Sequence, residues 1–147
     1  MAIALAMAIG LSSCTPTTPL VPESLVTTIE NDGRESTYDV AWQTTRLVVD
    51  IIEREAFDEL EDIALQLSAR LHRLEKARAE NMADRATART VSRLEEQVSQ
   101  RSTSENLDVL DDSANKALEF FDEGDFTSAK NYALEVLVIA RWLSNQQ

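Results

Sequence analysis

The chain has few glycines and prolines, which interrupt regular structure, and few cysteines and histidines, which often act in catalysis and metal binding. Its 147 residues include three glycines, three prolines, one cysteine and one histidine. Neither Gly nor Pro occurs between Arg34 and Glu123, a stretch rich in Ala, Leu, Glu and Arg, which favour helices. No sustained alternation of apolar and polar residues indicates a strand. We therefore expect an all-α fold.

The same scarcity argues against several kinds of active or metal site. With Cys14 as the only cysteine, the chain offers no Cys/His pair for nucleophilic catalysis. The only histidine, His72, is expected at a surface or boundary position, and it lacks the Glu three residues earlier that a di-iron bundle uses. Four carboxylates are spaced to share one helix face: Glu55, Asp58, Glu59 and Asp62. We interpret them as a solvated acidic face and expect no enzyme activity, no cofactor and no metal.

The N-terminal segment carries the most specific motif of the chain. Residues 2–11 are apolar and uncharged, and they are too few to span a membrane, which takes roughly 20 residues. The last of these residues begins the motif Leu11-Ser12-Ser13-Cys14. This order resembles a bacterial lipoprotein signal peptide with its lipobox. The resemblance implies cleavage before Cys14, lipidation of Cys14 and anchoring in the cell envelope.

Two further features bear on that resemblance. Thr15 stands where an Asp would favour retention in the inner membrane, so the resemblance implies the periplasmic face of the outer membrane if the organism is Gram-negative. No Lys or Arg precedes the apolar run, although signal peptides normally begin with positive charge. The departure predicts a true start upstream of Met1. The alternative to a lipoprotein signal peptide is an N-terminal apolar helix with an incidental cysteine.

A change in composition separates this segment from the rest of the chain. All three prolines lie at Pro16, Pro19 and Pro22 and alternate with threonines, which predicts an extended, disordered tether. The expected organisation is a signal peptide over 1–13, the lipidated cysteine and Pro/Thr-rich tether over 14–35, and a helical bundle domain over 36–147.

The apolar spacing predicts an elongated antiparallel bundle of three to four helices in that domain. The first helix starts near Ser36 or Thr37 and runs for about 40 residues. From Phe57 to Leu74 its apolar residues follow a heptad-like seam, which packs helix on helix or forms an intermolecular coiled coil. The chain is expected to reverse near residues 81–84.

The later helices have clearer boundaries. Ser102 and Glu105 fit a capping box, so a helix is expected to start after Ser102. Gly124 suits the left-handed position that ends a helix, and Asp125 suits the cap of the next one.

This last hairpin carries a second pattern. Ala117 and Ala129 are small, Phe120 is aromatic, and Gly124-Asp125-Phe126 forms the turn. Residues 113–137 thereby resemble a single tetratricopeptide-repeat hairpin, although Ser113 replaces the leading Trp and no second copy follows at the 34-residue period. The resemblance implies a helix–turn–helix of similar packing rather than a repeat array.

The net charge of −12 is unevenly distributed. Residues 23–66 hold twelve acids and three bases, residues 70–101 five acids and eight bases, and residues 105–125 eight acids and one lysine. One interpretation is that acidic and basic helices face each other within the bundle. The other is a basic patch near one tip, formed by Arg78, Arg85, Arg89 and Arg93, that binds phosphate headgroups, an acidic partner or an anionic cell-wall polymer. Nucleic acid is disfavoured because the acidic chain would repel it.

These observations give two functional hypotheses. The first is a non-enzymatic envelope lipoprotein whose helices bind or scaffold another envelope protein or polymer. The alternative is a structural spacer that forms a homo-oligomer through the 57–74 seam.

Overall fold

The computed structural model describes residues 38–76 and 82–146, and these residues form helices without any strand. The helices are α3 (Tyr38–Glu53), the 3-10 helix η3 (Phe57–Glu59), α4 (Leu60–Lys76), α5 (Met82–Gln100), α6 (Thr103–Asp122) and α7 (Phe126–Asn145). The all-α prediction is confirmed. The lipobox with Cys14, the Pro/Thr-rich tether and Arg78 lie outside the described residues.

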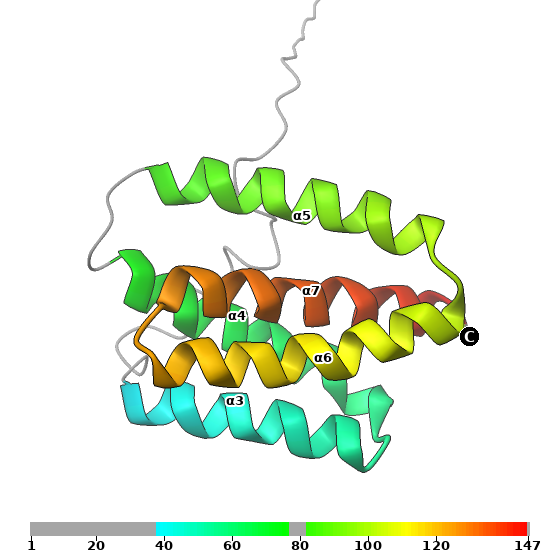
Figure 1. The fold of residues 1–147 in the computed structure, drawn as a ribbon, viewed down its shortest axis with the longest axis horizontal. Coiled ribbons are helices and arrows are strands. Elements are labelled where there is room, and N and C mark those ends of the chain that lie inside the picture. Colours follow the sequence, from blue (N-terminus) through cyan, green and yellow to red (C-terminus); the bar gives the residue numbers. More distant parts are fainter. Residues whose placement is uncertain (1–37, 77–81, 147) are drawn as a thin grey trace, which may run out of the picture.

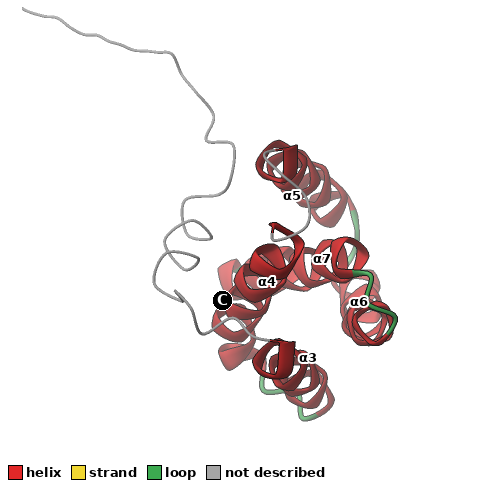
Figure 2. Cartoon of the chain, turned by 90° about the vertical axis from the view of Figure 1, so that its left-hand side faces the viewer, coloured by secondary structure: helices red, strands yellow, loops and turns green. Residues whose placement is uncertain are grey.

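The helices form a bundle with one additional helix on its outside. Helices α3, α4, α7 and α6 make a ring in which each contacts the next, and neighbours run antiparallel (Figure 1). Helix α5 lies outside this ring, packs mainly on α7 and runs parallel to it (Figures 1 and 2). Helix α7 is therefore covered by α4, α6 and α5 on three sides.

The sequence of α7 explains its central place. Between Ala133 and Ala140 only Glu135 is not apolar, so the helix has no wide polar face to turn toward water. Leu134, Val136, Leu137 and Ile139 are all buried. A helix that is apolar on every side must be surrounded by other elements, because burial of each side chain contributes about 2 kcal/mol.

The prediction of one long first helix is wrong, and the break gives the described chain five α-helices instead of three to four. Helix α3 ends in a Schellman motif, in which Ala56 N–H donates to Ile51 O and Glu55 N–H donates to Ile52 O, both at 3.0 Å. Glu55 occupies the left-handed position with φ of 57°. The sequence gives no signal for this stop, because glycine usually fills that position.

Packing explains why the chain accepts a strained residue there. The reversal folds the 57–74 seam back along α3 and against α7. Leu60, Ala64, Leu67 and Leu71 become fully buried within the chain, with Phe57 and Leu74 partly buried at the two ends. Leu47, an apolar residue of α3, is 40% exposed.

The corner between α5 and α6 confirms the predicted capping box. Ser102 Oγ accepts from Glu105 N–H at 3.1 Å, and Glu105 Oε1 accepts from Ser102 N–H at 2.8 Å. Buried Asn106 donates to Val98 O at 3.1 Å and so satisfies a carbonyl at the end of α5.

The α6–α7 hairpin also forms where predicted. Gly124 has φ of 78° within a second Schellman motif, and Asp125 caps α7 by accepting from Ser128 N–H at 3.0 Å. Ala117 and Ala129 are buried between the helices, as the repeat-like pattern implies.

Aromatic contacts fix the start of α3 against this hairpin. The ring of Tyr38 lies 4.7 Å from that of Phe121, which in turn contacts Phe126 edge-on at 5.4 Å. Trp42 Nε1 donates to Asp122 at 2.9 Å. Helix α3 is therefore tied to α6 by directional contacts as well as by apolar burial.

The two Schellman motifs give a paired prediction. We expect Glu55→Gly to stabilise the protein and Gly124→Ala to destabilise it, each by about 1 kcal/mol, because only glycine adopts the left-handed conformation without strain. A Cβ at position 124 meets no atom within 4 Å, so the cost there arises in the backbone alone. Urea unfolding of both variants measures the effect; equal stability of Gly124→Ala and the parent would contradict it.

A second prediction concerns the capping box and pH. The hydrogen bond from the Ser102 backbone lowers the pKa of Glu105 below its ordinary value of 4.5, with smaller contributions from the Ser102 side chain and Arg101. A lowered pKa in the folded state means that ionised Glu105 stabilises the fold above the unfolded pKa. This contribution is lost as pH falls through the folded pKa.

We therefore expect the parent to exceed Glu105→Gln in unfolding free energy at pH 7 and the two to converge in acid. Urea titrations of both proteins at several pH values measure this difference. A difference that does not change with pH would show that ionisation of Glu105 contributes nothing to the cap.

Candidate functional site

A groove lies between α5 and α6, with α7 as its floor. It encloses about 540 Å³, a volume within the range of ligand sites. Its lining consists of Arg93, Leu94 and Gln97 from α5, Phe120 from α6, and Ser128, Asn131, Tyr132 and Glu135 from α7. The groove exists because α5 packs on α7 without extensive contact to α6 beyond the corner that joins them.

An aromatic pair forms one side of the groove. The rings of Phe120 and Tyr132 are stacked, with centroids 5.6 Å apart and planes inclined by 6°. Both side chains are partly buried, so each presents some ring surface to the groove. Such a surface binds aromatic, proline or aliphatic groups.

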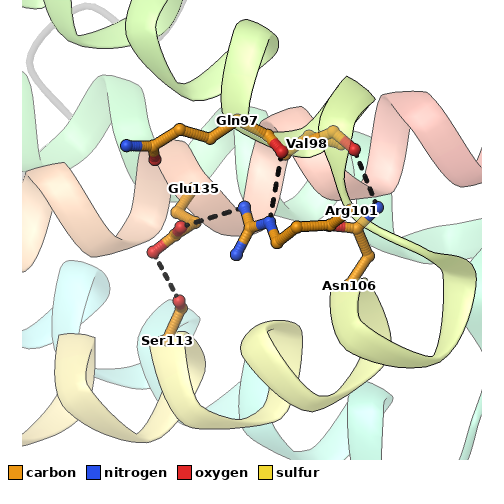
Figure 3. A network of polar contacts seen from close by, with 6 residues as sticks. All are labelled: Gln97, Val98, Arg101, Asn106, Ser113 and Glu135. Carbon is orange, nitrogen blue, oxygen red and sulfur yellow. Dashed lines mark hydrogen bonds and ion pairs between the residues drawn. The ribbon is translucent and has the colours of Figure 1, made fainter.

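A polar network holds the only carboxylate of the groove (Figure 3). Glu135 accepts from Ser113 Oγ at 2.8 Å, and Arg101 lies 3.5 Å from its other oxygen. The Nε of Arg101 also donates to Gln97 O at 3.3 Å. The charge of Glu135 is therefore balanced within the chain, and the side chain is 14% exposed.

The predicted basic patch is present in part. Arg85, Arg89 and Arg93 are exposed and lie four residues apart, hence on nearly one face of α5. Within residues 38–76 and 82–146 none of the three forms an ion pair. Only Arg93 lines the groove, and the row of arginines continues from it toward the start of α5.

Arg85, Arg89 and Arg93 form an arginine row on α5, and its position shows how acidic and basic helices are arranged. Helix α5 packs on α7, whereas the acidic α3 and α6 pack on each other. The interpretation that basic and acidic segments neutralise each other inside the bundle is therefore wrong for these three arginines. Their guanidinium groups face solvent.

A second polar cluster lies in the interior, where α4, α5 and α7 meet. Lys130 is 2% exposed, and its Nζ donates to Glu75 Oε1 at 2.7 Å, to Thr87 Oγ1, and to His72 Nδ1 at 3.1 Å. Because an ammonium group only donates, Nδ1 of His72 acts as the acceptor. The expectation of a surface or boundary position for His72 is wrong, since it is 2% exposed.

The four clustered carboxylates do not share a helix face. Glu55 lies in the turn, Asp58 and Glu59 lie in η3, and Asp62 lies in α4. All four are exposed, in agreement with the solvated interpretation. Among the described residues, no group of three or more His, Cys, Asp or Glu side chains is arranged to hold a metal ion.

Two parts of the site escaped sequence reasoning. The stacked pair of Phe120 and Tyr132 had no signal, because it depends on how α6 crosses α7. Lys130 left no clear signal either, because α7 also carries the charges of Glu135 and Arg141, which are not buried. Its partners Glu75 and Thr87 come from distant segments and could not be named.

Comparison with known proteins was made at three levels. No family model, curated protein or solved structure matches this chain. No helix among the described residues is both long enough and apolar enough to cross a membrane.

The buried cluster gives a prediction about stability. We expect Lys130→Met to lower the unfolding free energy by about 3 kcal/mol, because it leaves the Glu75 carboxylate buried without its ammonium partner. The double variant Lys130→Met/Glu75→Leu should be less destabilised than this single variant. Urea unfolding measures both.

The control for that experiment is Lys116→Met on α6. Lys116 is partly exposed and forms no ion pair with any described residue, so its replacement should change stability by less than about 0.5 kcal/mol. Equal stability of Lys130→Met and Lys116→Met would contradict the assigned role of Lys130.

Proposed function

We propose that this protein is a lipid-anchored cell-envelope lipoprotein that acts without catalysis, its helical bundle holding another envelope component. The observation that carries the binding part of the proposal is the open groove beside the arginine row on α5. The proposed location in the cell envelope rests on the lipobox-like sequence that ends at Cys14 and on the Pro/Thr-rich segment that follows it.

The chemistry of the groove supports binding rather than turnover. Two of its polar groups already have partners: Ser128 Oγ donates to Asp125 at 2.8 Å, and Glu135 is held by Arg101 and Ser113. His72, the only histidine, does not line the groove. The described lining residues thus include no histidine that could activate a hydroxyl for acyl transfer, and one carboxylate where glycosyl transfer uses a pair.

The alternative of a self-associating spacer fits the bundle less well. Leu60, Leu67 and Leu71 of the 57–74 seam have no exposed surface, because α3 and α7 cover them. Self-association through this seam would require the bundle to open. A surface groove requires no such rearrangement.

The envelope location is tested by labelling cells with a fatty-acid analogue. The protein is expressed from a gene that includes any coding sequence upstream of Met1. We expect label on the parent and none on Cys14→Ser, because the thiol of Cys14 is the acceptor of the lipid. Equal labelling of both proteins, or none on either, would contradict lipidation at Cys14 and with it the proposed location.

The binding role is tested by a photo-crosslinking residue placed at Gln97 in the groove, with Gln43 on α3 as the matched control. Both glutamines are exposed, so they differ mainly in location. We expect irradiation of intact cells to give a discrete adduct from position 97 and not from position 43. Indistinguishable products from the two positions would contradict a role for the groove.

A further inference from the structure

We infer that the groove between α5 and α6 binds an acidic, extended peptide segment of the partner protein. The inference rests on the proposed function and names the chemistry of its ligand. Three features of the lining carry it: the unpaired Arg93, the side-chain amides and the stacked aromatic pair. Each matches a different part of such a peptide.

The charge of the groove selects for anions. Glu135 is neutralised by Arg101, which leaves Arg93 as the uncompensated charge of the lining. Arg89 and Arg85 extend the positive row along α5, and no described residue neutralises them. A guanidinium group binds a carboxylate through two parallel hydrogen bonds, so successive arginines match successive Asp or Glu side chains.

Because the rest of the chain is acidic, the groove attracts an anionic partner only at short range. A net charge of −12 repels an acidic partner at long range. Attraction is therefore confined to positions within about a Debye length, roughly 8 Å at physiological salt, of the arginine row. An acidic segment is therefore favoured beside the arginines of α5 and disfavoured at the acidic surface of α3.

The amides distinguish a peptide from other polyanions. Gln97 on α5 and Asn131 on α7 line the groove from two sides. Each carboxamide both donates and accepts hydrogen bonds, which matches the alternating N–H and C=O groups of an extended backbone. A phosphate polymer or lipid headgroup presents acceptors almost exclusively and would pair with the carboxamide N–H groups alone.

The aromatic pair supplies the apolar contact. Phe120 and Tyr132 stack at 5.6 Å and lie in the same lining as Arg93. A peptide in which an apolar residue is flanked by acids places that residue on the rings while its carboxylates meet the arginines. Binding then depends on charge and on apolar contact together.

The test uses the full chain in neutral detergent micelles and a randomised decapeptide library displayed on phage. We expect the selected peptides to be enriched in Asp and Glu around an aromatic, aliphatic or proline residue. Affinity of a selected peptide should fall about tenfold or more in Arg93→Glu and in Tyr132→Ala, and less in Arg85→Glu, which lies beyond the groove.

The control variant is Arg46→Glu. Arg46 is an exposed arginine on α3, a helix that does not line the groove, and its replacement should leave peptide affinity unchanged. Arg93→Lys and Tyr132→Phe keep the charge and the ring, so they should retain most of the binding if those groups act as assigned. Circular dichroism of every variant separates lost binding from lost folding.

Several outcomes would overturn the inference. Selection of neutral or basic peptides, no selection, or equal affinity of parent and Arg93→Glu would each do so. Binding of phosphatidylglycerol vesicles or polyphosphate that depends on Arg93, without peptide selection, would identify a phosphate ligand instead. In all these cases a crosslinked adduct at position 97 would leave the proposed scaffold function standing, whereas its absence would remove that function too.

Discussion

The structure depends on covering α7, a helix whose second half is apolar on nearly every side. Three helices are needed to do this, and each of the other features follows from that requirement. Helix α4 reaches α7 because the chain reverses at Glu55, α6 reaches it through the Gly124 hairpin, and α5 covers the remaining side from outside the four-helix ring. Since α5 and α6 both pack on α7 but scarcely on each other, a groove stays open between them.

Apolar packing alone does not fix how α4 and α5 lie along α7, because contacts between aliphatic side chains have little directional preference. The buried cluster around Lys130 adds direction. Its Nζ contacts Glu75 and His72 of α4 and Thr87 of α5, so one ammonium group sets the position of three helices at once. An interior charge of this kind contributes to register more than to net stability, because desolvation offsets much of the attraction.

The proposed function uses the part of the surface that this packing leaves incomplete. The tether and lipid would hold the bundle near a membrane, and the groove would hold a segment of another protein. The groove is polar at Arg93, Gln97 and Asn131 and apolar at its stacked rings, a mixture typical of peptide recognition rather than of a buried small-molecule site. Arg93 in the groove, with Arg89 and Arg85 beyond it on α5, presents unpaired positive charge on an otherwise acidic chain.

The sequence by itself determined the all-α class, the capping box at Ser102 and the turn at Gly124, because these depend on local preferences of a few neighbouring residues. It also determined which residues of 60–71 are apolar and inward-facing, since helical spacing requires no partner. Only the tertiary structure decided that α3 stops before Glu55, that His72 is buried beside Lys130, and that Arg93 shares a groove with Phe120 and Tyr132. The reason is physical: a non-glycine residue accepts a left-handed conformation, and distant polar side chains meet, only when burial elsewhere compensates the cost.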